Sequence, residues 1–283
     1  MSVIAWFAAA ATSAAGGFIT AVCGFGMGPV TMSVLPYVMP YSRAVAVTGL
    51  FGLVLGLIIV WEGRHSVNVK TLIPCAAAGL IGSSLAAGLS AGAAEKIMVR
   101  GLGVLLMLLS VYSVFFSGRI KIRATPLNGL LAGAIGGTLT GMFSVGGPPI
   151  AIYMLAATES NDEYRSTLNA HFSIVNICAA ASRFFAGSLT GGDFLAFLKL
   201  LAFLGLGMWA GDRVFHRLDA AKLRKAVYAT GVNMGIGHEP NGGVTTLEIS
   251  KSELPPCKTL TIAVRPLTSL GTFGKAISTT FAA

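Results

Sequence analysis

Charged side chains are scarce in this sequence. Only 11% of its 283 residues are Asp, Glu, Lys or Arg, whereas 54% are hydrophobic and the mean hydropathy is +0.76. Soluble domains carry about 25% charged residues, so this composition argues against an ordinary cytosolic enzyme. It is typical of a chain that crosses a bilayer many times, with about 20 apolar residues in each crossing.

Motifs for metal binding, cofactor binding and covalent catalysis are also lacking. The four cysteines are isolated, and neither Cys-x-x-Cys nor a histidine pair with ligand spacing occurs. Walker A, Gly-x-Ser-x-Gly and His-Glu-x-x-His are absent, and the glycines at 24, 26 and 28 have the wrong spacing for a dinucleotide site. No basic face is interleaved with aromatics, as nucleic-acid binding requires. We therefore expect no cofactor, metal, nucleic-acid partner or enzymatic activity.

Apolar segments separated by charged or polar breaks make up most of the chain. Nine such segments cover residues 3–22, 29–39, 44–61, 71–90, 97–116, 127–143, 148–157, 167–186 and 194–209. The second and the seventh are short, because about 11 helical residues cover only about 17 Å of a roughly 30 Å hydrocarbon core. These two segments are expected to be half-helices or strongly tilted. Such broken backbone is tolerated at membrane depth only where protein or a water-filled cavity covers it.

An internal repeat relates the two halves of the chain. A shift of 120 residues superposes Gly16, Gly17, Thr20, Gly26 and Pro29 on Gly136, Gly137, Thr140, Gly146 and Pro149. We expect a first membrane repeat at 1–117, a basic connector at 118–126, a second membrane repeat at 127–232 and a polar, atypical tail at 233–283. The fold class predicted is an all-α polytopic membrane protein of two inverted-topology repeats with broken helices.

Basic residues gather in loops that the repeat places on one side of the membrane. If every segment crosses once, or if each long and short pair together returns the chain to the same side, the loops at 62–70, 118–126, 159–166 and 210–225 share one face and hold most of the loop charge. The opposite loops hold little beyond Arg43 and Lys96. The positive-inside rule then puts the basic loops in the cytoplasm and the N-terminus outside. Because the first half has an odd number of segments, the second half is inverted, as in many secondary transporters.

Two glycine-rich breaks, GFGMGP at 24–29 and SVGGPP at 144–149, are the candidate binding site. Each ends in proline at the start of a short helix, where glycines leave backbone N–H groups uncovered. A helix N-terminus carries roughly +0.5 charge, so two facing breaks favour an anion. Alternatively, the glycines only permit close helix packing and the prolines only kink the chain. The candidate substrate-binding residues here are Gly24, Gly26, Gly28, Pro29, Ser144, Gly146, Gly147, Pro148 and Pro149.

Further candidates lie on the long segments that follow the breaks. Arg43 and Arg165 occupy equivalent positions and are candidates for gating or for attracting an anion from either face; the alternative is that they snorkel to the interface. Asn169 and His171 are candidates for substrate binding, because polar groups in hydrocarbon face the bundle interior. They, like the nearby Asn176, are explained equally by hydrogen bonds between helices. Arg183, near a segment end, is expected to snorkel.

These residues resemble a known family. The Gly-Gly pair before a glycine-rich break with proline, the motif SVGGPP in the second half, and an Arg-headed segment after each are similar to the sulfite exporter TauE/SafE family of membrane transporters. The resemblance covers about residues 4–231. It implies an inner-membrane carrier without an ATPase, associated with sulfite, organosulfonates or similar small anions, that uses an ion gradient. It does not fix the substrate.

The end of the chain departs from this pattern. The stretch 219–232 begins like the fifth apolar segment, but from residue 233 the sequence becomes polar and rich in glycine and proline. A helix cut after about ten residues cannot span a bilayer, so the tenth crossing is expected to be incomplete. We expect the tail to be mostly irregular and to lie outside the bilayer.

Together these features predict an inner-membrane secondary transporter of small anions, with sulfite, organosulfonates or related sulfur oxyanions as substrates. Its expected partners are the lipid bilayer, the anion and a coupling ion. The alternative is a non-transporting membrane scaffold or accessory subunit, in which the glycine breaks serve packing alone. Anion flux into proteoliposomes discriminates between the two functions.

Overall fold

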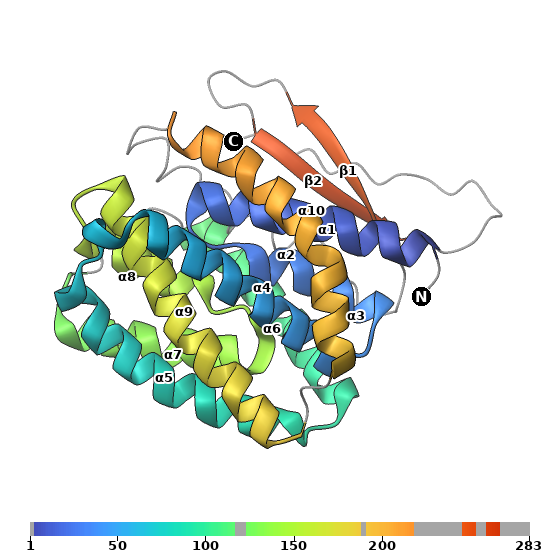
Figure 1. Ribbon diagram of the computed structural model, residues 1–283, viewed down its shortest axis with the longest axis horizontal. Coiled ribbons are helices and arrows are strands. Elements are labelled where there is room, and N and C mark those ends of the chain that lie inside the picture. Colours follow the sequence, from blue (N-terminus) through green and yellow to red (C-terminus); the bar gives the residue numbers. More distant parts are fainter. Residues whose placement is uncertain (1–2, 117–122, 188–190, 218–244, 253–258, 267–283) are drawn as a thin grey trace. The chain divides into compact units, whose positions relative to one another are not determined.

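The structure is a computed structural model that describes residues 3–116, 123–187, 191–217, 245–252 and 259–266 (Figure 1). The chain divides into two compact units, Met1–His238 and Glu239–Ala283. The described part of the first unit is helical, and that of the second is a pair of strands. Residues 118–122 of the expected connector, the stretch 219–232 and the expected tail boundary at 233 lie outside the described residues.

The first half of the chain forms six α-helices and one short 3-10 helix. They are α1 (Val3–Cys23), α2 (Met27–Met32), α3 (Leu35–Val38), α4 (Tyr41–Glu62), η1 (Arg64–Ser66), α5 (Val69–Ala91) and α6 (Glu95–Phe116). The second half forms α7 (Pro126–Phe143), α8 (Gly147–Ala157), α9 (Asn161–Phe185) and α10 (Gly191–Phe215). The short apolar segment expected at 29–39 is therefore two helices, α2 and α3.

Among the described residues, four helices are long and apolar enough to cross a membrane, namely α1, α4, α5 and α10. The prediction of a helical chain with several membrane-spanning segments is confirmed to this extent, and the number of nine stays a prediction. Helix α9 is the most polar of the long helices, yet Tyr164–Ala170 are all buried. Polar residues within a membrane bundle face its interior, which explains why this helix is polar.

Local signals fix where several helices begin. Asn68, Thr125 and Ser160 cap α5, α7 and α9, each by accepting a hydrogen bond from the backbone N–H three residues later. Such caps satisfy an N–H group that has no partner within the helix. Helix α9 therefore begins six residues before the apolar segment expected at 167–186, and its first turn lies among charged residues.

Helices α1 and α10 pack closely through glycine (Figure 1). A side chain at Gly17 would collide with the carbonyl oxygen of Leu204, and one at Gly207 would collide with that of Ala14. Small residues let the two backbones approach closely, which is how helices associate in lipid.

Helices α5 and α7 make the matching contact. A side chain at Gly137 would collide with the backbone of Gly79, and one at Gly82 would meet the carbonyl oxygen of Ala134. Ala134 and Gly137 of α7 lie 120 residues after Ala14 and Gly17 of α1. Gly79 and Gly82 of α5 lie 125 residues before Leu204 and Gly207 of α10. The two interfaces therefore use corresponding positions of the two halves.

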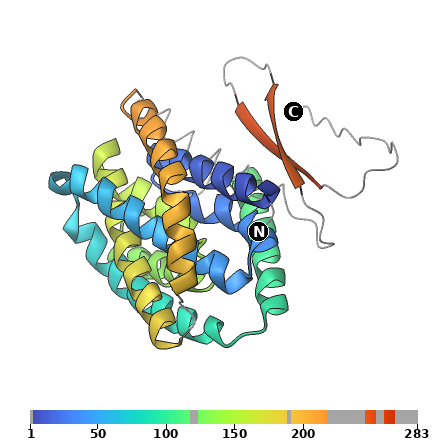
Figure 2. The same ribbon diagram turned by 45° about the vertical axis from the view of Figure 1, so that its right-hand side comes forward.

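Helix α9 lies between these pairs, alongside α4 and α5 (Figure 2). At one end of the bundle, the first residues of α4 contact α6 and α10: the Tyr41 N–H donates to Glu95 at 2.5 Å, and Arg43 pairs with Asp193. At the other end, the start of α5 meets the start of α9, where the Asn68 amide donates to Glu163 at 2.6 Å.

The second unit is an antiparallel hairpin of β1 (Thr245–Ser252) and β2 (Thr259–Pro266). Thr245 lies opposite Pro266, and Ser252 lies opposite Thr259. The expectation of a mostly irregular tail is wrong for these two segments. Both contain several β-branched residues, which favour strands and which the sequence analysis did not weigh.

Candidate functional site

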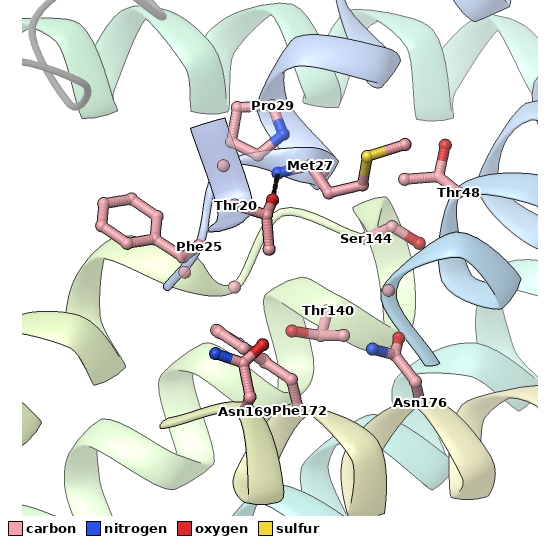
Figure 3. A pocket seen from close by; sticks show the side chains of 15 residues that line it. Thr20, Phe25, Met27, Pro29, Thr48, Thr140, Ser144, Asn169, Phe172 and Asn176 are labelled. Carbon is pink, nitrogen blue, oxygen red and sulfur yellow. Dashed lines mark hydrogen bonds between the residues drawn. The ribbon is translucent and has the colours of Figure 1, made fainter. Parts of the chain in front are cut away.

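The first break separates α1 from α2. Helix α1 ends at Cys23, and Gly24 and Gly26 follow with φ of 81° and 129°. These angles favour glycine, because side chains of L-residues are strained there. Helix α2 then begins at Met27, whose N–H donates to the hydroxyl of Thr20 at 2.8 Å (Figure 3). The first turn of α2 therefore has one amide that is already satisfied by the protein.

The second break separates α7 from α8 at the equivalent place. Ser144, which is 120 residues after Gly24, follows the last residue of α7 and has a left-handed backbone with φ of 54°. Its hydroxyl donates to the carbonyl oxygen of Val45 on α4 at 3.1 Å. Helix α8 begins at Gly147, with Pro148 in its first turn. Since Pro148 and Pro149 carry no N–H, Gly147 supplies the free donor of this turn.

The two breaks touch each other. A side chain at Gly28 would collide with the carbonyl oxygen of Ser144, and one at Gly147 would collide with the ring of Phe25. Backbone from the two halves of the chain is therefore in van der Waals contact at this point, and glycine is required on both sides of it.

A cavity of about 50 Å³ lies where the breaks meet, bounded by α4 and α9 (Figure 3). This volume has room for roughly three to five atoms of the size of a water molecule. The residues that line the cavity are Thr20, Phe25, Gly26, Met27, Gly28, Pro29, Thr48, Gly52, Thr140, Ser144, Gly146, Gly147, Asn169, Phe172 and Asn176. None of these side chains is charged.

Seven of the predicted site residues line this cavity, from both breaks and from α9: Gly26, Gly28, Pro29, Ser144, Gly146, Gly147 and Asn169. Gly24, Pro148, Pro149 and His171 do not. Gly24 instead contributes its carbonyl oxygen, which accepts a hydrogen bond from the Asn169 amide at 3.1 Å. The same amide nitrogen donates to the carbonyl of Arg165 at 2.8 Å. One bond thus holds the first break against α9, and the other lies within α9 itself.

His171 faces away from the cavity. It is two residues after Asn169, which is about 200° around the helix, and its ring packs against Gly79 of α5. The side chain is fully buried, and neither ring nitrogen has a hydrogen-bond partner among the described residues. Its predicted contact with substrate in this cavity is therefore not seen in this conformation.

Several lining residues were not among the predicted site residues. Phe172 and Asn176 are three and seven positions after Asn169, so helical periodicity alone places them on the same face of α9. Thr20 and Thr140 belong to the matched repeat positions, which was a second signal. Asn176 is buried beside Gly52 of α4, with its amide at the cavity wall.

The two candidate arginines do not line the cavity and are engaged in ion pairs. Arg43 Nε lies 2.8 Å from Asp193, and the arginine side chain is 44% exposed. Arg165 Nη2 lies 2.7 Å from Asp212, and its guanidinium stacks over the ring of Phe215 at 4.3 Å. Within the described residues, no group of three His, Cys, Asp or Glu side chains has the geometry of a metal site.

Interrupted helices around a cavity without charged side chains, in a bundle with apolar helices of membrane length, are the features that many polytopic membrane transport proteins share. The chain belongs to the sulfite exporter TauE/SafE family, whose family model matches residues 9–237. The resemblance drawn from the glycine motifs is thus confirmed, and the family is one of transporters rather than enzymes. No curated protein and no solved structure gives a significant match to the chain.

Proposed function

We propose that this protein is a secondary transporter of sulfite or a related small sulfur oxyanion in the inner membrane, and that the anion binds in the cavity between the two breaks. The observation that carries the proposal is that one cavity is lined by both breaks together, Gly26–Pro29 from the first half and Ser144–Gly147 from the second. Backbone opened in this way within an apolar bundle needs a polar occupant, because unsatisfied N–H groups are costly in hydrocarbon.

The chemistry of the lining favours an anion. The N-terminus of α8 carries a partial positive charge and presents the N–H of Gly147, while Asn176 supplies an amide group that can donate. The hydroxyl groups of Thr48 and Ser144 also line the cavity, but they donate to Thr31 and to Val45. No carboxylate lines the cavity to repel a negative charge. Helix α2 contributes less than its sequence indicated, because Thr20 already occupies the N–H of Met27.

The size of the cavity favours a small oxyanion. Sulfite has four non-hydrogen atoms, and a cavity of about 50 Å³ has room for an ion of this size. Sulfite and related small sulfur oxyanions are therefore the proposed substrates.

Two inverted repeats are the proposed basis of transport. The matching glycine contacts of α1 with α10 and of α7 with α5 support a two-fold relationship between the halves. In this arrangement the cavity lies on the pseudo-symmetry axis, and rocking of one half against the other exposes it to each face alternately. The basic loops lie in the cytoplasm and the N-terminus lies outside, and an ion gradient drives the cycle.

Flux of radiolabelled sulfite through proteoliposomes tests this function. Purified wild-type protein should carry sulfite across the membrane, and Gly147→Leu should abolish the flux, because its side chain covers the amide and meets Phe25. Gly205→Leu is the matched control, since a side chain at Gly205 meets no atom within 4 Å. A folded wild-type protein without flux of sulfite, thiosulfate or organosulfonates would instead favour a scaffold or accessory subunit.

A further inference from the structure

A second cavity, of about 160 Å³, lies outside the helix breaks. It is formed where the first residues of α4 and α6 meet the last residues of α5 and α9, and it shares no lining residue with the first cavity. The residues that line it are Tyr41, Ser42, Val45, Ser90, Ala93, Glu95, Met142 and Arg183. It therefore contains a guanidinium, a carboxylate and three hydroxyl groups.

Arg183 supplies the positive charge at the buried end of this cavity. Its side chain is buried, with 6% of the residue exposed, although its position near the end of α9 predicted that it would snorkel. Its Nη2 donates to the carbonyl oxygen of Gly141 in the last turn of α7, where a cation is favoured by the helix dipole. A guanidinium has five N–H donors in a planar fork that suits oxyanions, and an anion beside it offsets the cost of burying its charge.

The lining of this cavity runs from exposed to buried residues. Ser42 and Glu95 are exposed, whereas Tyr41, Val45 and Arg183 are buried. Glu95 accepts a hydrogen bond from the N–H of Tyr41 at 2.5 Å and so caps the start of α4. The N-cap residue of this helix, Pro40, makes no such hydrogen bond with its side chain. The carboxylate therefore has a structural role at the mouth, and its charge weakens rather than creates an anion site.

One hydrogen bond joins the linings of the two cavities. The Ser144 hydroxyl, at the first cavity, donates to the carbonyl oxygen of Val45, which lines the second. Within the second lining, the Tyr41 hydroxyl donates to the carbonyl oxygen of Met142 at 2.7 Å. The two cavities are therefore neighbours at the Ser144–Val45 contact.

We infer that the Arg183 cavity is a second binding site for the transported oxyanion, through which the anion passes between the surface at Glu95 and the cavity at the breaks. This inference rests on the transport function proposed above. Arg183 holds the anion at the buried end of its cavity, and the Val45–Ser144 contact separates this anion from the cavity at the breaks until the contact opens.

Equilibrium binding of radiolabelled sulfite to the purified full-length protein tests the inference. Wild type should bind two sulfite ions per chain. Arg183→Gln should weaken the second site about ten-fold or more, as expected for loss of a charged hydrogen-bond donor. Arg183→Lys should keep most of the affinity, and Glu95→Gln, whose side-chain carbonyl still caps α4, should strengthen binding. Arg100→Gln, at an exposed position of α6, is the matched control for the change of charge.

A second variant guards against misfolding of Arg183→Gln. Ser42→Leu fills the exposed mouth and leaves the guanidinium in place, so it should also reduce the number of bound sulfite ions to one. Two ions bound with wild-type affinity in both folded variants would overturn the inference, and weaker binding in Glu95→Gln would contradict an anion as the ligand.

The two proposals fail in different ways. If sulfite binds beside Arg183 but not in the cavity at the breaks, Gly147→Leu binds sulfite like wild type and Arg183→Gln loses a site. If sulfite binds in the cavity at the breaks but not beside Arg183, Gly147→Leu loses a site and Arg183→Gln binds sulfite like wild type. Absence of sulfite binding in the wild-type protein would overturn both.

Discussion

Arg43 and Arg165 are paired with opposite ends of the same helix. Arg43 binds Asp193 in the first turn of α10, and Arg165 binds Asp212 near its last turn. These two acids are 19 positions apart, or about 28 Å along a helix. Helices α4 and α9 therefore begin at opposite ends of α10, which is the arrangement that the proposed inverted repeat predicts for these two arginines.

Breaking the half-buried Arg165–Asp212 pair should destabilise the protein. Arg165→Gln removes the guanidinium from Asp212 and the stacking on Phe215. Because the Asp212 side chain is 30% exposed, the expected cost is about 1 to 2 kcal/mol, less than for a fully buried pair. Thermal unfolding in detergent should show a clearly lower midpoint. Adding Asp212→Asn should recover part of the loss, because the double variant has no unpaired charge. A double variant less stable than Arg165→Gln would contradict a direct coupling.

The left-handed backbone of Ser144 predicts a difference between two small replacements. Ser144→Ala and Ser144→Gly both lose the hydrogen bond to Val45, but only alanine keeps the side-chain clash at a φ of 54°. Ser144→Gly should therefore be more stable than Ser144→Ala by about 1 kcal/mol. Thermal unfolding of the two purified variants measures this difference. Equal stabilities would mean that the break is not held in this conformation.

The two asparagines of α9 should respond differently to replacement. Asn176→Ala should weaken sulfite binding about ten-fold and change the unfolding midpoint little, because its amide borders the cavity. Asn169→Ala should lower the unfolding midpoint more, because the carbonyl oxygens of Gly24 and Arg165 lose their donor. Isothermal titration with sulfite and thermal unfolding separate the two effects. If Asn176→Ala instead lowered the unfolding midpoint and Asn169→Ala weakened sulfite binding, the roles proposed for these two residues would be wrong.

Cysteine labelling tests the orientation in the membrane. In a background without the native cysteines, His65→Cys and Thr125→Cys should be labelled only after the membrane is made permeable, because both lie in loops placed in the cytoplasm by their positive charge. Lys96→Cys, on the opposite side, should react in intact cells. Reaction of the first two with an impermeant reagent in intact cells would reverse the topology.

The positions of the breaks could be predicted from the sequence because their signals are local. A glycine-rich stretch followed by a proline in the first helical turn marks the start of both α2 and α8, whatever packs around them. The choice of Gly26, Gly28, Gly146 and Gly147 as cavity residues rested on these signals.

Other features depend on contacts between distant parts of the chain and could not be predicted in this way. The partner of Arg43 is 150 residues away in sequence, and nothing near Arg43 indicates it. The burial of Arg183 depends on α7, and its position near a segment end indicated snorkelling instead. Asn169 and His171 were predicted together because both are polar residues within one apolar segment, although helix geometry places them on different faces of α9.

A crystal structure with selenite, the heavier analogue of sulfite, tests the binding site most directly, because selenium gives an anomalous signal. The proposed function predicts an anomalous peak in the cavity at the breaks, within hydrogen-bond distance of the Gly147 N–H and beside Asn176. A second peak beside Arg183 is expected at higher concentration. Peaks only outside the cavity at the breaks, in a protein that transports sulfite, would contradict the account.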